Sequence, residues 1–380
     1  MIRRALLALC LLLALPAAAL DPMGAWVQRM EARNIRASAG LWDLETGRLL
    51  EGHQMDLALV PASTTKVLST YALLKTWKPN YRIETEVWGD LRGDTVAGDL
   101  VFKGAGDPFL TGERLWLLAE ELKARGVRTV SGKLRIDQGA FDDQRYGNGW
   151  EGTSSNTTPP ILPFSVNFNK EDGRLVKDPD RLALETLART LRQAGITVEG
   201  GPSGSEGRRL LAFPSLPLRD LVGDINKFSN NFMIEMLVKR FGGGTWTQGI
   251  RQIQAFYQTM LDLGPDKVAL TDGSGLSKEN HLSARTLAIV LRAAWNDFEV
   301  GPEMVGSLKI IGGEPFRLHI KDPDLARRIR CKTGHLNGVT SVCGYLQMLD
   351  GRRRVFAVIL NGPCAEADAW DLVRRWASQG

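Results

Sequence analysis

The sequence predicts an α/β (α+β) protein in which both ends of the chain build one sheet flanked by helices, with a mixed α/β subdomain inserted between them. Helix-period and strand-period segments alternate along the chain without internal repeats or low-complexity tracts. A hairpin and a helix come early, while three strands and an amphipathic helix close the chain. Short strands and helices in the middle are separated by stretches rich in glycine, serine and proline. These three observations place the two halves of one domain on either side of an insert.

The composition is that of an ordinary globular protein. The chain has 380 residues, of which 43% are hydrophobic and 24% charged, which is enough for two or three domains with buried cores. The net charge of +5 is dispersed along the chain, and no basic run is dense enough to suggest a nucleic-acid groove. We therefore expect no nucleic-acid partner.

Residues 1–19 have the order of a secretory signal peptide. Arg3 and Arg4 precede an apolar run at 5–15, and small alanines follow at 17–19. The run is shorter than the about 20 apolar residues that a membrane span needs. Cys10 follows a bulky leucine, where lipoprotein processing would require a small residue. We expect cleavage after this segment, export across the cytoplasmic membrane and no stable membrane anchor.

The two ends of the chain supply the elements of the expected sheet domain. Residues 36–50 predict a hairpin around a turn at 45–47, and residues 63–77 predict a helix that Pro79 closes. The second half of the chain predicts helices at 229–240, 246–262 and 283–296, strands at 328–333, 340–349 and 354–361, and a final helix at 366–378. That helix follows the last strand directly, so we expect it to pack on the core.

The middle of the chain predicts a separate subdomain. Its elements are strands at 100–103 and 130–137 and helices at 112–125 and 179–194, and a glycine-rich cluster at 200–207 precedes its end. We therefore expect an inserted subdomain at 83–214. The segments 20–82 and 215–380 then form one discontinuous catalytic domain.

Three cysteines remain after the signal segment, namely Cys331, Cys343 and Cys364. This number is too small for a fold built on disulfides. Cys331 and Cys343 are symmetric about Asn337 in a predicted hairpin, so they can be cross-strand partners in an oxidising compartment. Two small buried thiols are an equally good interpretation of the same pattern.

Several kinds of chemistry find no support in the sequence. The four histidines, His53, His281, His319 and His335, lack the spacing of zinc ligands. The chain contains no G-x-S-x-G nucleophile elbow, and its glycine-rich segments match neither a phosphate loop nor a dinucleotide turn. We therefore expect no metal and no cofactor.

A Ser/Lys pair at the start of a predicted helix is the first candidate for catalysis. Ser63 and Lys66 are three residues apart, a spacing that places two side chains on one helix face. A neutral lysine there can remove the serine proton, and the helix N-terminus favours a developing oxyanion. The alternative is that Ser63 only caps the helix and Lys66 is solvated.

Two further short motifs carry compatible chemistry. Ser229 and Asn231 begin a predicted helix and can present a hydroxyl and an amide to a cleft, although N-capping is the alternative. Lys332 and Thr333, at the end of a predicted strand, can bind a carboxylate. Gly334, which follows them, lets the backbone approach a substrate closely.

In this order, the three motifs resemble the signature of the penicillin-binding proteins and serine β-lactamases. The mature chain is most similar to the D-alanyl-D-alanine carboxypeptidase/endopeptidases, the class C low-molecular-mass penicillin-binding proteins. This resemblance implies a transpeptidase-like domain, with an antiparallel sheet flanked by helices. The segments that carry the resemblance are Pro61-Ala62-Ser63-Thr64-Thr65-Lys66, Gly104-Ala105-Gly106-Asp107-Pro108, Ser229-Asn230-Asn231-Phe232-Met233, Asp272-Gly273-Ser274-Gly275-Leu276-Ser277 and Lys332-Thr333-Gly334-His335-Leu336-Asn337-Gly338-Val339.

The resemblance also implies a role for each residue of these motifs. Ser63 resembles the acylated nucleophile and Lys66 its base, while Ser229 and Lys332 resemble the proton relay to the leaving D-alanine. Asn231 resembles the clamp on the substrate backbone and Thr333 the group that binds its terminal carboxylate. The backbone N–H groups of Ser63 and His335 would then form the oxyanion hole.

Three further residues bear on substrate preference through the same resemblance. Asp137 and Phe141 are similar to family residues that receive the side chain of the stem-peptide diamino acid, although an Asp at a strand end also suits a turn. Lys278 stands where the family often has Arg, which would weaken a bidentate carboxylate contact to a point charge. His335 replaces the small hydroxyl residue often found after the Lys-Thr-Gly and adds an imidazole at the rim of the expected cleft.

The activity implied by the resemblance is that of a periplasmic serine carboxypeptidase or endopeptidase that cleaves peptidoglycan stem peptides after D-alanine. β-Lactam antibiotics would then be covalent inhibitors. The alternatives are a serine β-lactamase or esterase of the same fold, and a catalytically silent wall-binding protein. A lysine base must be neutral, and we expect burial and a nearby cation, Lys332, to lower the pKa of Lys66.

Overall fold

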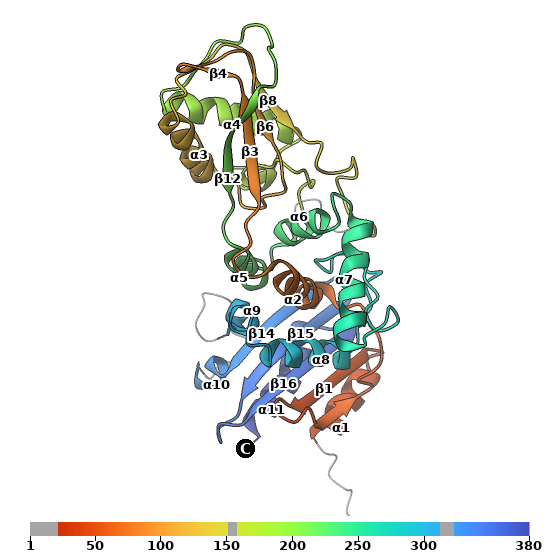
Figure 1. Cartoon of the computed structure of the whole chain (residues 1–380). Helices are drawn as coiled ribbons and strands as arrows, with labels where there is room; N and C mark the ends of the chain where they lie inside the picture. The colour runs from red at the N-terminus through yellow and green to blue at the C-terminus, as the bar shows by residue number, and fades with distance from the viewer. Residues whose placement is uncertain (1–21, 151–157, 312–322, 380) are drawn as a thin grey trace, which may run out of the picture.

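The structure is a computed structural model that describes residues 22–150, 158–311 and 323–379. The predicted signal segment, with Cys10, and His319 lie outside the described residues. The chain forms two lobes, one built around a sheet from both ends of the chain and one built from its middle (Figure 1). Within the described ranges, none of the helices combines the length and the apolar character needed to cross a membrane.

A six-stranded antiparallel sheet joins the two ends of the chain. Its strand order is β13-β14-β15-β16-β1-β2. The hairpin of β1 and β2 pairs through β1 with β16, so that Arg36 lies opposite Asn361 and Asp43 opposite Arg354. The strands are β1 (Arg36–Asp43), β2 (Leu49–His53), β13 (Lys309–Ile310), β14 (Ile329–Leu336), β15 (Val339–Gln347) and β16 (Arg353–Asn361).

Helices cover both faces of this sheet (Figure 1). Strand β15 shows why, because its residues alternate between two apolar cores: Cys343 and Tyr345 belong to one, Val342 and Leu346 to the other. The first face carries α2 (Thr65–Trp77), α5 (Leu218–Phe228), α6 (Asn231–Phe241), α7 (Trp246–Leu261), α8 (Ala284–Trp295) and α9 (Gly301–Ser307), and the second carries α1 (Pro22–Glu31), α10 (Pro323–Arg327) and α11 (Glu366–Ser378).

The register of the β14–β15 hairpin determines whether the two cysteines of the sheet can form a disulfide. Cys331 lies opposite Gly344, and Cys343 lies opposite Lys332. A register displaced by one residue turns the two thiols to opposite faces of the sheet. Both are free and buried, so the structure excludes the cross-strand disulfide and has the two buried thiols instead.

The second lobe has its own sheets and its own apolar core, made by residues from Val87 to Phe213. Two helices, α3 (Gly112–Ala124) and α4 (Pro179–Gln193), pack on a sheet of order β12-β3-β6-β8. The strands of this sheet are β3 (Glu84–Gly89), β6 (Leu100–Lys103), β8 (Leu134–Asp137) and β12 (Arg208–Pro214). A second sheet contains β4 (Leu91–Arg92), β5 (Thr95–Val96), β7 (Thr129–Val130) and β11 (Thr197–Val198), and β9 (Lys170–Glu171) pairs with β10 (Arg174–Leu175).

The single strand predicted at 130–137 is wrong, because the structure has two strands there in different sheets. Strand β7 ends at Val130 and β8 begins at Leu134. Gly132 lies between them against the backbone of Gly98, where an added Cβ would be 2.4 Å from the Gly98 carbonyl carbon. The chain bends at this close contact and passes from one sheet to the other.

We propose a division of the chain at residues 83 and 214. The two connections between the lobes lie side by side, since Glu84 pairs with Pro214. Ile83 and Ser215 hold each other, with the Ser215 N–H donating to the Ile83 carbonyl at 2.7 Å and the Ile83 N–H donating to Ser215 Oγ at 2.9 Å. One part of the insert returns to the first lobe, where Phe141 and Trp150 belong to its apolar core.

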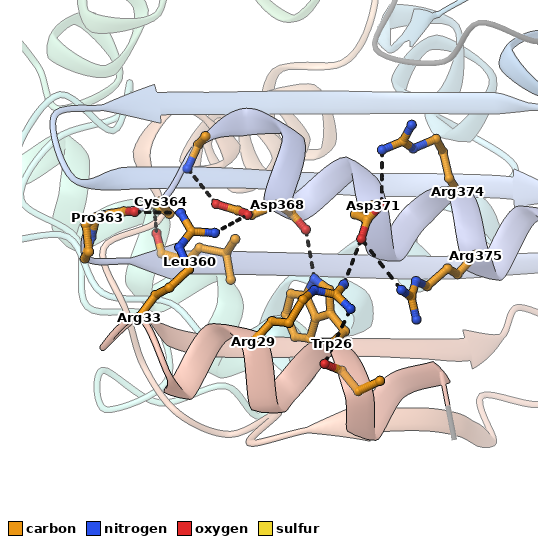
Figure 2. Close-up of polar contacts among 12 residues, drawn as sticks. Trp26, Arg29, Arg33, Leu360, Pro363, Cys364, Asp368, Asp371, Arg374 and Arg375 are labelled. Carbon is orange, nitrogen blue, oxygen red and sulfur yellow. Dashed lines mark hydrogen bonds and ion pairs between the residues drawn. The ribbon is translucent and has the colours of Figure 1, made fainter. Parts of the chain in front are cut away.

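Helix α1 is fixed to α11 by a buried tryptophan and exposed ion pairs (Figure 2). Trp26 is fully buried, and its Nε1 donates to the Asp368 carbonyl at 2.8 Å. Arg29 forms an ion pair of 2.8 Å with Asp371, in which both side chains are at least 40% exposed. Burial of the tryptophan therefore dominates this contact.

We expect Trp26→Ala to lower the free energy of unfolding by about 3–5 kcal/mol, the usual cost of removing a buried aromatic side chain. Arg29→Ala should cost about 1 kcal/mol or less, because exposed ion pairs are screened by solvent. Urea unfolding followed by circular dichroism measures both values. Equal losses in the two variants would contradict the dominance of the tryptophan.

Candidate active site

Ser63 lies in a tight turn that precedes α2. The predicted helix at 63–77 is divided into a 3₁₀ turn, η1 (Ala62–Thr64), and α2. Ala62 has a φ of 48°, in the left-handed region that a non-glycine residue seldom adopts. Gly275 packs on it so closely that an added Cβ would lie 1.9 Å from the Ala62 carbonyl oxygen. The turn directs Ser63, which is partly exposed, into a cavity.

Lys66 is buried directly behind Ser63. Its side chain is completely inaccessible to solvent, and its Nζ lies 3.0 Å from Ser63 Oγ. The same nitrogen lies 2.6 Å from Asn231 Oδ1 and 2.7 Å from the Ser274 carbonyl oxygen. A neutral amine can donate to these two oxygens and accept the Ser63 proton through its lone pair. The arrangement leaves no place for the solvated lysine of the alternative interpretation.

Burial lowers the pKa of Lys66 to about 7, although the negative charges of Glu235 and Asp272 act against this change. Lys332, the expected second cation, is also completely buried, but burial alone lowers the pKa of Lys66. Burial and the charge of Lys66 lower the pKa of Lys332 well below its usual value. At neutral pH a large fraction of Lys66 is therefore uncharged.

The segment around Ser229 joins α5 to α6, and a different residue of this segment, Asn230, caps the second helix. Ser229 has a φ of 55° and ends α5, and the Asn230 side chain accepts a hydrogen bond from the Met233 N–H at 3.1 Å at the start of α6. Because Asn230 is the cap, Ser229 and Asn231 are available to the cavity. Lys332 Nζ donates to Ser229 Oγ at 2.8 Å.

Strand β14 brings the third motif against the Ser63 turn. Lys332 Nζ also donates to the Thr333 carbonyl at 2.7 Å, while Thr333 lines the cavity. An added Cβ at Gly334 would lie 2.7 Å from the backbone nitrogen of Ser63 and 2.4 Å from Ser341 Oγ. Only glycine lets the turn lie this close to the strand, and this closeness places the Ser63 N–H beside the segment that carries His335.

One cavity of about 600 Å³ unites most of the predicted residues. Lys66 and Lys332 lie behind its wall, bonded to Ser63 and Ser229. The lining residues are Ser63, Ser229, Asn231, Thr333, Gly334 and His335, together with Lys309, Thr340, Ser341, Val342, Glu366, Ala369 and Trp370. The sequence contains no signal for Lys309, Glu366, Ala369 and Trp370, because β13 and α11 reach the cavity only through the tertiary fold.

Three predicted residues do not line this cavity, and their contacts with a substrate stay a prediction. Asp137 is exposed at the end of β8, and its Oδ1 accepts from the Gly139 N–H at 2.8 Å, so it serves the turn of the alternative interpretation. Phe141 is buried, with its ring centroid 5.4 Å from Lys239 Nζ. Lys278 is exposed beyond the Asp272–Ser277 segment.

Sequence reasoning also missed Glu235, a completely buried acid on α6. Its signal is a charged residue inside the apolar run from Phe232 to Val238. No group of three or more histidine, cysteine, aspartate or glutamate side chains that could hold a metal ion occurs among residues 22–150, 158–311 and 323–379.

Comparisons with known proteins agree with this fold. A carboxypeptidase of Mycobacterium tuberculosis is 29% identical over 360 residues, covering 84% of this chain and 75% of the relative. A D-alanyl-D-alanine carboxypeptidase of an Actinomadura species is 27% identical over 434 residues, covering 86% of this chain and 79% of that protein. The crystal structure of penicillin-binding protein 4 from Haemophilus influenzae superposes with a TM-score of 0.79 and 18% identity over 93% of this chain and 99% of that chain, which confirms the predicted fold.

The sequence pattern of one peptidase family matches residues 28–175 and 162–378, which is most of the chain. This match confirms the resemblance that the Ser-Lys, Ser-Asn and Lys-Thr-Gly motifs indicated. The chain therefore belongs to the D-Ala-D-Ala carboxypeptidase 3 (S13) family.

Proposed function

We propose that this protein is a serine D-Ala-D-Ala carboxypeptidase, a D-alanyl-meso-diaminopimelate endopeptidase, or both, acting on peptidoglycan stem peptides through a Ser63 acyl-enzyme. The observation that carries the proposal is the buried Lys66 amine, with a pKa lowered to about 7, at 3.0 Å from Ser63 Oγ. Family membership supports the reaction class. β-Lactams should acylate the same serine.

Acylation follows from the contacts of the two buried lysines. Neutral Lys66 takes the Ser63 proton while Oγ attacks the carbonyl carbon of the penultimate D-alanine. The oxyanion faces the backbone N–H groups of Ser63 and His335. The C–N bond then breaks, the Ser229 hydroxyl passes a proton to the leaving amine, and the proton that Lys66 took from Ser63 restores Ser229 by way of Lys332. Water later hydrolyses the ester and restores Ser63.

Substrate binding uses the polar groups that line the cavity. Because Asn231 Oδ1 accepts from Lys66, the amide NH₂ of Asn231 is left to donate to a substrate carbonyl. Thr333 is assigned to the terminal carboxylate, and the cation of Lys309 on the same cavity wall favours a negative group. Contacts of Asp137, Phe141 and Lys278 with the substrate stay a prediction.

The cellular location follows from the proposed substrate and from the N-terminal sequence. The proposed substrate lies outside the cytoplasmic membrane, and the N-terminal sequence has the order of an export signal. We therefore place the protein in the periplasm.

The direct test is digestion of defined peptidoglycan fragments with the purified protein. We expect release of D-alanine from pentapeptide monomers, conversion of cross-linked dimers to monomers, or both, with products identified by mass. A covalent penicillin adduct should form on Ser63. Rapid turnover of a chromogenic cephalosporin would instead indicate a β-lactamase, and the absence of both adduct and products would indicate a silent wall-binding protein.

Lys66→Arg should abolish acylation, because a guanidinium stays protonated at every working pH and cannot accept the serine proton. Labelling of Ser63 by a fluorescent penicillin, read on a gel, measures this effect. Circular dichroism and thermal unfolding show whether the variant is folded. Labelling of a folded variant at the wild-type rate would refute Lys66 as the base.

The acylation rate of the wild-type protein should rise with pH up to about 7 and level off above it. Below the pKa of Lys66, which burial lowers to about 7, the amine is protonated and cannot accept the serine proton. The rate should therefore fall about tenfold for each pH unit below this value. Stopped-flow acylation between pH 5 and 9 gives the profile, and a rate independent of pH would contradict a lysine base.

A further inference from the structure

Glu235 is a buried acid to which the proposed reaction gives no task. It follows Asn231 by four residues on α6, and this spacing places both side chains on one helix face. Its side chain is completely buried. A buried carboxylate is tolerated only where hydrogen-bond donors or opposite charges compensate for lost water, so the contacts of Glu235 explain its presence.

Three N–H groups meet the Glu235 carboxylate. Oε1 accepts from the Ser274 backbone at 2.6 Å, and Oε2 accepts from Trp246 Nε1 at 2.9 Å and from the Gly273 backbone at 3.3 Å. An ionised carboxylate can accept all of these hydrogen bonds. A protonated acid would turn its own O–H toward one of the donors. The contacts therefore favour the carboxylate form.

The segment held by Glu235 is the Asp272–Ser277 loop, one of the motifs that the sequence singles out. Ser274 connects the acid to the base, because its N–H binds Glu235 and its carbonyl oxygen lies 2.7 Å from Lys66 Nζ. The Gly273 carbonyl accepts from Ser69 Oγ at 2.8 Å, which ties the loop to α2 as well. The loop thus fixes one of the oxygens that orient the Lys66 amine.

Glu235 and the Asp272–Ser277 loop also act on Lys66 through their charges. The charged groups that interact with Lys66 or Glu235 are Lys332 on β14 and Asp272 on the loop. Lys239 lies one turn after Glu235, and its Nζ is 4.5 Å from the centroid of the Trp246 ring. Burial and Asp272 raise the pKa of Glu235, whereas its hydrogen bonds to Ser274, Trp246 and Gly273 act in the opposite direction and favour the carboxylate. The charges of Glu235 and Asp272 raise the pKa of Lys66, against the larger effect of burial.

We propose that Glu235 is a positioning residue for the Lys66 base, acting through the Asp272–Ser277 loop. Its carboxylate holds the Ser274 peptide so that the carbonyl oxygen orients the amine toward Ser63. The proposal rests on the proposed function. The contacts also assign a role to the Asp272–Ser277 motif, which holds the base.

Glu235→Gln tests both effects of the carboxylate. The amide NH₂ must face at least one of the N–H donors, so the loop should move and the plateau rate of penicillin acylation should fall roughly 10- to 100-fold. Removal of the negative charge should move the midpoint of the acylation pH profile to lower pH by roughly half to one unit. A residue needed only for folding would reduce the active fraction and leave the midpoint unchanged.

Glu235→Asp separates position from charge, and it decides the question if the glutamine variant does not fold. The shorter acid keeps the charge but cannot reach all three donors, so the plateau should fall while the midpoint stays within about 0.3 pH unit of the wild type. An unchanged plateau in Glu235→Asp would overturn the proposal, as would a folded Glu235→Gln with the wild-type plateau and midpoint.

Asp107→Asn is the matched control. Asp107 is also buried, with a pKa raised to about 6 by burial, but it lies in the inserted lobe and does not line the cavity. This variant should keep both the plateau and the midpoint, whatever its stability. If the wild-type protein itself is not acylated, the proposed function fails. If it is acylated and Glu235 variants behave like the control, only the positioning role fails.

Discussion

The burial of the Lys66 amine beside the Ser63 hydroxyl is the constraint on which the rest of the structure depends. A solvated lysine has a pKa near 10.4 and is almost entirely charged at neutral pH. Burial reverses that preference only if carbonyl and amide oxygens satisfy the N–H groups of the neutral amine. Asn231 and Ser274 supply these oxygens from segments far from Lys66 along the chain. Catalytic competence therefore depends on how well these segments meet.

The sheet and the helices around it hold the segments that contact Lys66 in a fixed arrangement. Strand β14 carries Lys332 and Gly334, and the glycine lets the Ser63 turn lie directly on the strand. Helix α6 brings Asn231 and Glu235, one turn apart, to the other side of Lys66. Since protein interiors are closely packed, small displacements in any of these elements change the contacts of the amine. The buried lysines are costly for the fold, and the surrounding apolar core compensates for that cost.

Much of the fold was predictable because it depends on local patterns. The predicted helix at 246–262 is α7 (Trp246–Leu261), and that at 283–296 is α8 (Ala284–Trp295). The prediction failed where distant contacts decide. The strand predicted at 130–137 is broken by the packing of Gly132 on Gly98. Strands β3 and β12 were missed because each is completed by pairing with a partner more than 100 residues away.

The sequence by itself determined which residues are candidates for the proposed chemistry, because Ser63 and Lys66 are close through helical spacing and the other motifs are recognisable as short patterns. Only the tertiary structure decided that the Lys66 amine is buried, that Cys331 and Cys343 face opposite sides of the sheet, and that Asp137 serves a turn. The physical reason is that burial and strand register arise from contacts between distant segments. Lys66 and Asn231, for example, are 165 residues apart in the chain.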